Sequence, residues 1–138
     1  MGLPTQEASW LTGRSAPTRR PRPAAPPGGP YSQGVAAGNL VFLAGQVPMD
    51  AHGAVVEGGF DAQARRAFDN LAAVAEAAGS SLRDAVRVGV YLRDMANFAS
   101  MNEVFAEYFG DPPPVRTTLP VELRGFEIEV DAILVLEG

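Results

Sequence analysis

The residues best suited to chemistry in this chain are one arginine and one carboxylate in its C-terminal part. Arg116 stands in the segment Pro114-Val115-Arg116-Thr117-Thr118, and Glu129 follows thirteen positions later in the alternating run Glu127-Ile128-Glu129-Val130-Asp131. The absence of Cys excludes thiolate nucleophiles, disulfides and Cys-ligated zinc, and the absence of Lys excludes Schiff-base chemistry. The single histidine, His52, lies in a predicted turn without the companions that a metal site needs. An arginine and a carboxylate are therefore most of what the sequence offers.

The length of 138 residues fits one domain, and a hydrophobic content of 46% is typical of globular proteins. Residues 1–27 are rich in Pro, Arg, Ser, Thr and Ala without hydrophobic periodicity, which predicts a disordered N-terminal extension before a folded domain at 28–138. We interpret this Arg-rich segment as a solvated extension or a misassigned start, in preference to a transit peptide. No run approaches the roughly 18 apolar residues of a membrane span, so we expect a cytoplasmic protein without a membrane partner.

The charge of the predicted domain argues against nucleic acid as a partner. Four of the 11 Arg and one of the 16 acidic residues lie in the first 22 positions, so the rest of the chain holds 7 Arg and 15 acids, a net charge of −8. A domain this acidic repels phosphate backbones. A ribonuclease or RNA-binding role is therefore disfavoured.

Two segments have the three- and four-residue spacing of apolar side chains that predicts amphipathic helices. The first covers residues 60–78 and is stopped by Gly79, and the second covers 98–108 behind an expected N-cap at Asn97. Ser81-Leu82-Arg83-Asp84 has the spacing of a capping box, which predicts a single helical turn.

Four further segments are predicted to be strands, at 39–47, 86–92, 115–121 and 127–136. The strand at 86–92 has one apolar face, made of Val86, Val88, Val90 and Leu92. The order of elements predicts an α+β fold, a mixed sheet with both helices on one face. The uncovered face would be apolar, which predicts a homo-oligomer with ligand sites between subunits.

Five sequence blocks resemble the reactive intermediate deaminase family, also called RidA or YjgF, over nearly all of residues 28–138. The blocks are Gly29-Pro30-Tyr31-Ser32-Gln33-Gly34, residues 39–48, residues 77–82, residues 97–102 and Pro114-Val115-Arg116. The resemblance implies a chorismate-mutase-like sandwich and a homotrimer with clefts between its subunits. It also implies hydrolysis of reactive 2-imino or enamino acids to 2-oxo acids and ammonia, without metal or cofactor.

The resemblance also implies roles for individual residues. Arg116 matches the family's substrate-binding arginine, whose planar guanidinium can hold a carboxylate by two parallel hydrogen bonds. Glu129 matches the acidic residue that activates water and shuttles the proton. Tyr31 is expected to line the same cleft and help to place substrate or water.

Four more positions are expected at the substrate. Asn102 matches a polar position near the family's site, and the backbone at Gly45 and Gln46 would complete the pocket, since glycine permits close approach. Thr118, the fourth, stands where many members carry Cys. Besides these four, Ala44 departs from the family because it stands where many members carry Ser or Thr.

The segment at 119–126 is about two residues shorter than in common members of the family. This leaves both the alignment of Glu129 and the range of substrates open. Glu129 shares a strand face with Glu127 and Asp131, so a solvated acidic stripe is one alternative, and Asp131 replaces Glu129 if the register differs. A noncatalytic carboxylate binder and a pathway-specific hydrolase with a larger substrate are the alternative functions. The sequence leaves the physiological substrate open.

Overall fold

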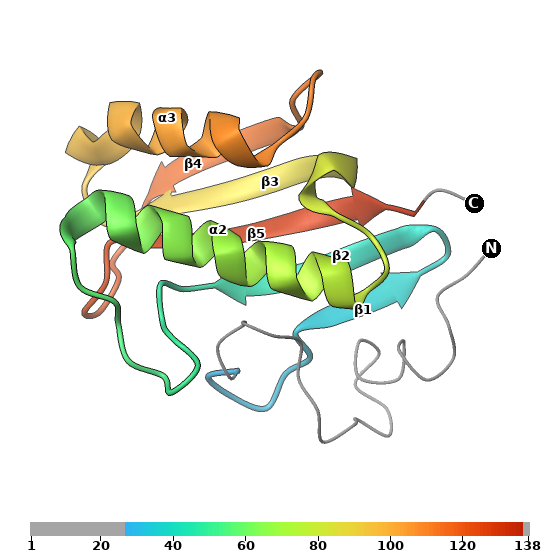
Figure 1. Ribbon diagram of the computed structural model, residues 1–138, viewed down its shortest axis with the longest axis horizontal. Coiled ribbons are helices and arrows are strands. Elements are labelled where there is room, and N and C mark those ends of the chain that lie inside the picture. Colours follow the sequence, from blue (N-terminus) through green and yellow to red (C-terminus); the bar gives the residue numbers. More distant parts are fainter. Residues whose placement is uncertain (1–26, 137–138) are drawn as a thin grey trace.

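The computed structural model describes residues 27–136, so the predicted extension at 1–27 lies almost entirely outside the described residues. Within this range five strands form one sheet in the order β1-β2-β5-β3-β4 (Figure 1). Their bounds are Gly34–Ala37 for β1, Leu40–Gln46 for β2, Ala85–Leu92 for β3, Val115–Pro120 for β4 and Ile128–Val135 for β5. β3 and β4 pair in parallel, whereas every other pairing is antiparallel. The predicted mixed sheet is confirmed.

Two helices, α2 (Gly59–Ala77) and α3 (Phe98–Tyr108), run side by side across one face of the sheet (Figure 1). Their apolar stripes pack on the sheet residues that are completely buried beneath them, namely Val41, Val88, Val90, Leu92, Ile128, Val130 and Leu134. Gly79 has a φ of 81°, a left-handed conformation that favours glycine, and ends α2 as predicted. None of the described helices is long and apolar enough to cross a lipid bilayer.

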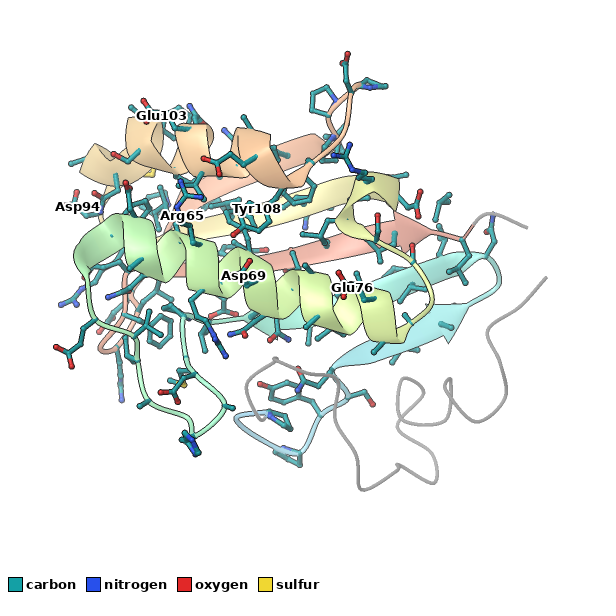
Figure 2. The ribbon with its side chains drawn as sticks, in the orientation of Figure 1. Arg65, Asp69, Glu76, Asp94, Glu103 and Tyr108 are labelled. Carbon is teal, nitrogen blue, oxygen red and sulfur yellow. The ribbon has the colours of Figure 1, made fainter. Side chains whose placement is uncertain are left out.

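Polar contacts join the two helices at their exposed surface. Arg65 of α2 and Glu107 of α3 form a two-pronged ion pair with N···O distances of 2.6 and 2.9 Å. The Tyr108 hydroxyl donates to Asp69 at 2.8 Å, and Figure 2 shows both side chains between the helices. Beneath them the Phe68 ring stacks on Tyr108 and meets Phe105 edge to face. These contacts fix α3 against α2 and so fix its place over β4.

Two local features differ from the sequence predictions, and a third agrees with them. The strand β1 was not predicted separately, because its four residues are small and carry little apolar alternation. Asn97 is at the N-cap position of α3, as predicted, but its side chain makes no capping bond. A 3₁₀ turn at Met95–Asn97 precedes α3, and Asp94 caps that turn by accepting from the Ala96 N–H. The turn predicted at 81–84 is confirmed as a 3₁₀ helix at Leu82–Asp84, capped by Ser81.

The predicted burial of Val86 is also wrong, because this side chain is 44% exposed. The pairing of β3 with β5 shifts register between Ala85 and Arg87, and a bulge of this kind turns one residue out of the regular alternation. Val88, Val90 and Leu92 follow the predicted pattern and are fully buried.

The face of the sheet opposite the helices, called here the open face, is uncovered by any described element. Val35, Phe42 and Leu119 lie on it and are 38%, 42% and 48% exposed. The register of the sheet places Phe42 beside Ile133, so the apolar surface extends from β2 to the neighbouring strand β5. The uncovered apolar face that the sequence predicts is therefore present in the described part of the chain.

Candidate functional site

A cavity of about 230 Å³ lies beside the open face, between the N-terminal loop, the end of β2 and the start of β5. Its lining consists of Pro27, Gly28, Tyr31, Gln33, Gly45, Gln46, Val47, Met49, Phe126 and Glu129. Four residues that the sequence nominates, Tyr31, Gly45, Gln46 and Glu129, therefore come together. We call this group the acid half-site.

Glu129 is the carboxyl group of the acid half-site. β2 pairs irregularly with β5 between Leu43 and Gln46, and in this stretch the Gly45 backbone lies against the Glu129 carboxylate. Burial, with a contribution from the nearby Asp131 charge, raises the pKa of Glu129 above its ordinary value. A carboxyl group with a raised pKa is better matched to proton transfer near neutral pH than an ordinary one.

The N-terminal loop closes one side of the acid half-site. The Tyr31 hydroxyl accepts from the Gly28 N–H at 3.0 Å, and the Tyr31 ring is half exposed at the cavity rim. Deeper in, the Gln46 side-chain amide donates to the Gln33 side-chain oxygen at 2.8 Å, and both residues are buried. This amide pair joins the N-terminal loop to the end of β2.

Side chains of α2 hold the segment that follows β2 by hydrogen bonds. Asn70 is completely buried, and its side-chain amide donates to the carbonyls of Val47 and Met49, each at 2.9 Å. Arg66 donates to the same Met49 carbonyl at 3.0 Å. Since Val47 and Met49 both line the cavity, Asn70 and Arg66 determine the position of its wall.

Replacing Asn70 with Ala should lower the free energy of unfolding by about 1–3 kcal/mol, because it removes two hydrogen bonds of a buried side chain, each with a net contribution of about 0.5–1.5 kcal/mol. Urea unfolding followed by circular dichroism measures the change. The matched control is Asn97→Ala, since Asn97 makes no side-chain cap bond, and we expect a change within about 0.5 kcal/mol. Equal effects of the two substitutions would contradict the role assigned to Asn70.

The other predicted site residues gather between β4 and α3, in what we call the arginine half-site. The Arg116 guanidinium lies over the rings of Phe105 and Phe98, with its central carbon 4.7 and 5.6 Å from their centroids. One of its nitrogens is 3.7 Å from the Met101 sulfur. Burial lowers the pKa of Arg116, but arginine stays protonated at any ordinary pH.

No acidic side chain forms an ion pair with Arg116 among residues 27–136. Thr118 lies two residues further along β4 on the same face, and its buried hydroxyl has no hydrogen-bond partner in this range. Asn102 lies on the same side of α3, one turn after Phe98. A half-buried cation beside an unpartnered hydroxyl is an arrangement that a carboxylate ligand would satisfy.

The two half-sites lie on opposite faces of the sheet of this chain. Arg116 pairs with Val88, whose side chain faces the helices, whereas Glu129 pairs with Tyr91 on the open face. Strand β3 also separates β4 from β5. The structure thus brings Glu129 together with Tyr31, and Arg116 together with Thr118, but it does not bring Arg116 to Glu129.

Several residues of these half-sites were missed in the sequence. Gln33 belongs to the block from Gly29 to Gly34, so its position there was a usable signal. Phe98 and Phe105 were identified only as part of a helical stripe, because the spacing of core and site aromatics is the same. In the described part of the chain, no three His, Asp or Glu side chains gather closely enough to hold a metal ion.

Comparison with known proteins gives consistent matches over the described domain. The sequence model for Endoribonuclease L-PSP matches residues 22–136. A RutC family protein of Pyrococcus horikoshii is 48% identical over 110 residues, which cover 78% of this chain and 87% of that protein. A protein of Dermatophagoides farinae named 2-iminobutanoate/2-iminopropanoate deaminase is 40% identical over 119 residues, covering 83% and 93%. The crystal structure of RidA from the Antarctic bacterium Psychrobacter sp. superposes with a TM-score of 0.79 at 38% identity, covering 87% of this chain and 99% of that one.

Proposed function

Since this chain belongs to the Endoribonuclease L-PSP family, which includes proteins named RidA, we propose that it hydrolyses small reactive 2-imino or enamino acids to 2-oxo acids and ammonia. The observation that carries the proposal is the pair of half-sites. One presents a cation without an acidic partner in the described chain, and the other presents a carboxyl group with a raised pKa beside a small cavity. The relative named as an imine deaminase supports the same chemistry.

The complete site is proposed to form between subunits of a homotrimer. Arg116 and Glu129 lie on opposite faces of the sheet, so a substrate of a few carbon atoms cannot reach both in one subunit. The exposed apolar residues of the open face favour association with another copy of the chain. In a closed ring each site would take Arg116 from one subunit and Glu129 from its neighbour.

The chemistry of each half-site gives it a separate role. Arg116 holds the substrate carboxylate by two parallel hydrogen bonds, and the Thr118 hydroxyl and Asn102 amide complete its polar surroundings. Glu129 takes a proton from water as the water oxygen bonds to the imine carbon, and passes that proton to nitrogen. Glu129 then passes the remaining hydroxyl proton to the nitrogen as the C–N bond breaks, which yields the 2-oxo acid and ammonia and leaves Glu129 ionised as before. Tyr31 lies at the rim of the acid half-site, where it can orient substrate or water.

The direct test is the hydrolysis of 2-iminopropanoate, formed in solution from alanine by an amino-acid oxidase. We expect the purified protein to shorten the lifetime of the imine, and the loss of the imine can be followed by trapping with semicarbazide. Calorimetric titration with pyruvate tests binding separately. Pyruvate binding without any acceleration would favour a noncatalytic carboxylate binder, and acceleration only of bulkier imines would favour a pathway-specific hydrolase.

Gly45→Ala should lower kcat/KM about 10- to 100-fold, because catalysis is sensitive to displacements of about 1 Å. A Cβ at this position would overlap the Glu129 carboxylate and displace it. Gly53→Ala is the control, since a Cβ there meets no atom within 4 Å and the residue lies outside the cavity. Its φ of 84° predicts some loss of stability but no loss of activity per folded molecule. Steady-state kinetics on both variants checks this, and an unaffected Gly45→Ala would contradict the assigned position of Glu129.

A further inference from the structure

A charged cluster on the open face surrounds Asp131. One of its carboxylate oxygens accepts from the Gly89 N–H and from Arg87, each at 3.0 Å. The other oxygen accepts from the Tyr91 hydroxyl, also at 3.0 Å. A Cβ at Gly89 would overlap this arrangement, so the glycine is required for the close approach of Asp131. Three donors therefore hold the carboxylate in one orientation.

The cluster is adjacent to Glu129. Asp131 is two residues along β5, so both side chains point to the same face, roughly 7 Å apart along the strand. On β3, Tyr91 is directly opposite Glu129, and Gly89 is directly opposite Asp131. Tyr91 has one hydroxyl proton and gives it to Asp131, so this hydroxyl is not a donor to Glu129.

We propose that Asp131, held by Arg87, Tyr91 and the Gly89 backbone, is a positioning residue whose negative charge controls proton uptake and release by Glu129. This inference rests on the proposed hydrolysis, in which Glu129 moves the proton. It assigns Asp131 a defined role outside direct contact with the substrate, whereas the sequence offered it only as a substitute for Glu129.

The other charged and titratable groups near Glu129 are already engaged or lie at the rim. On β5, Glu127 is paired with Arg93 at 3.3 Å, and on β3, Arg87 is paired with Asp131. Tyr31 lies across the cavity, and β2 contributes only Gly45 and Gln46 to its lining. Burial is the largest cause of the raised pKa of Glu129, and Asp131 adds to it.

The sign of the effect follows from the charges. A negative neighbour disfavours ionisation of Glu129, so removing the Asp131 charge should lower the pH at which Glu129 titrates. Arg87 offsets part of that charge, so removing Arg87 should raise the same pH. If the cluster had only a structural role, the two substitutions would not shift the Glu129 titration in opposite directions, because either one would loosen the same contacts.

The test is a pH titration of Glu129 by carbon NMR on protein labelled at the glutamate carboxyl carbons, with the signal assigned by its absence in Glu129→Gln. We expect the midpoint to move down in Asp131→Asn, and to move up in Arg87→Gln and in Tyr91→Phe. An unchanged midpoint in Asp131→Asn, or movement of Asp131→Asn and Arg87→Gln in the same direction, would overturn the proposal.

The titration needs no substrate, so its outcome is independent of whether the protein hydrolyses imines. Where hydrolysis is measurable, the acidic limb of the pH profile of kcat/KM should move with the NMR midpoint in each variant. A limb that stays fixed while the midpoint moves would overturn the link between Asp131 and catalysis, and it would leave the hydrolysis itself supported.

Discussion

Arg116→Ala should lower kcat/KM for 2-iminopropanoate by about a thousandfold, which corresponds to the roughly 4 kcal/mol expected for the loss of one partner from a hydrogen-bonded charge pair. The guanidinium lies over two aromatic rings without an acidic partner among the described residues, so its charge is free for a substrate carboxylate. Most of the loss should be in KM, because the carboxylate takes no part in the bond changes. Steady-state kinetics over a range of imine concentrations separates KM from kcat.

Two further substitutions show which property of Arg116 matters. Arg116→Lys keeps the charge but loses the planar pair of donors, so we expect an intermediate loss. Arg65→Ala is the matched control, because Arg65 is also half exposed but pairs with Glu107 on the helix surface. Full activity in Arg116→Ala would contradict the proposed site, and a similar loss in Arg65→Ala would point to a general effect of charge.

The secondary structure could be predicted where the hydrophobic pattern is long and lies within one segment of the chain. The stripe over residues 60–78 corresponds to α2 within one residue at each end, because five turns of helix repeat the pattern often enough. Val86 was placed wrongly because a bulge depends on how β3 pairs with β5, which the alternation of one strand does not record. Asn97 takes the predicted N-cap position of α3 without a side-chain bond, and Asp94, three residues earlier, caps the 3₁₀ turn that the sequence pattern did not predict.

Most residues of the candidate site could be nominated from the sequence, with Gln33, Phe98 and Phe105 as exceptions, but their arrangement could not. Alternation within β5 is enough to place Glu129 and Asp131 on one face. Arg116 lies on the other face because of the register in which β4 pairs in parallel with β3. The sequence of either strand alone does not predict that register. The Asp131 cluster likewise requires three strand positions to be in register, so the sequence presented Asp131 only as an acidic residue near Glu129.

Mixed oligomers of two inactive variants should regain activity if the site forms between subunits. Glu129→Gln keeps the shape of the side chain but cannot take a proton, so we expect a loss of about 10²- to 10⁴-fold. In a trimer assembled at random from equal amounts of Arg116→Ala and Glu129→Gln subunits, about a quarter of the sites would combine an intact Arg116 with an intact Glu129. Each trimer that contains both variants holds one such site out of three, so isolated mixed trimers should show about a third of the wild-type rate, far above either variant alone.

Two variants that alter the same half-site should not restore activity when they are mixed. Gly45→Ala and Glu129→Gln both alter the acid half-site, so their mixed oligomers should contain no fully intact site and should remain below the recovered activity. Co-expression with two different affinity tags, followed by sequential purification, isolates the mixed species, and native mass spectrometry gives their composition. Mixed trimers of Arg116→Ala and Glu129→Gln without recovery would contradict a site shared between subunits. Recovery in the Gly45→Ala control would show that Gly45 and Glu129 do not belong to one half-site.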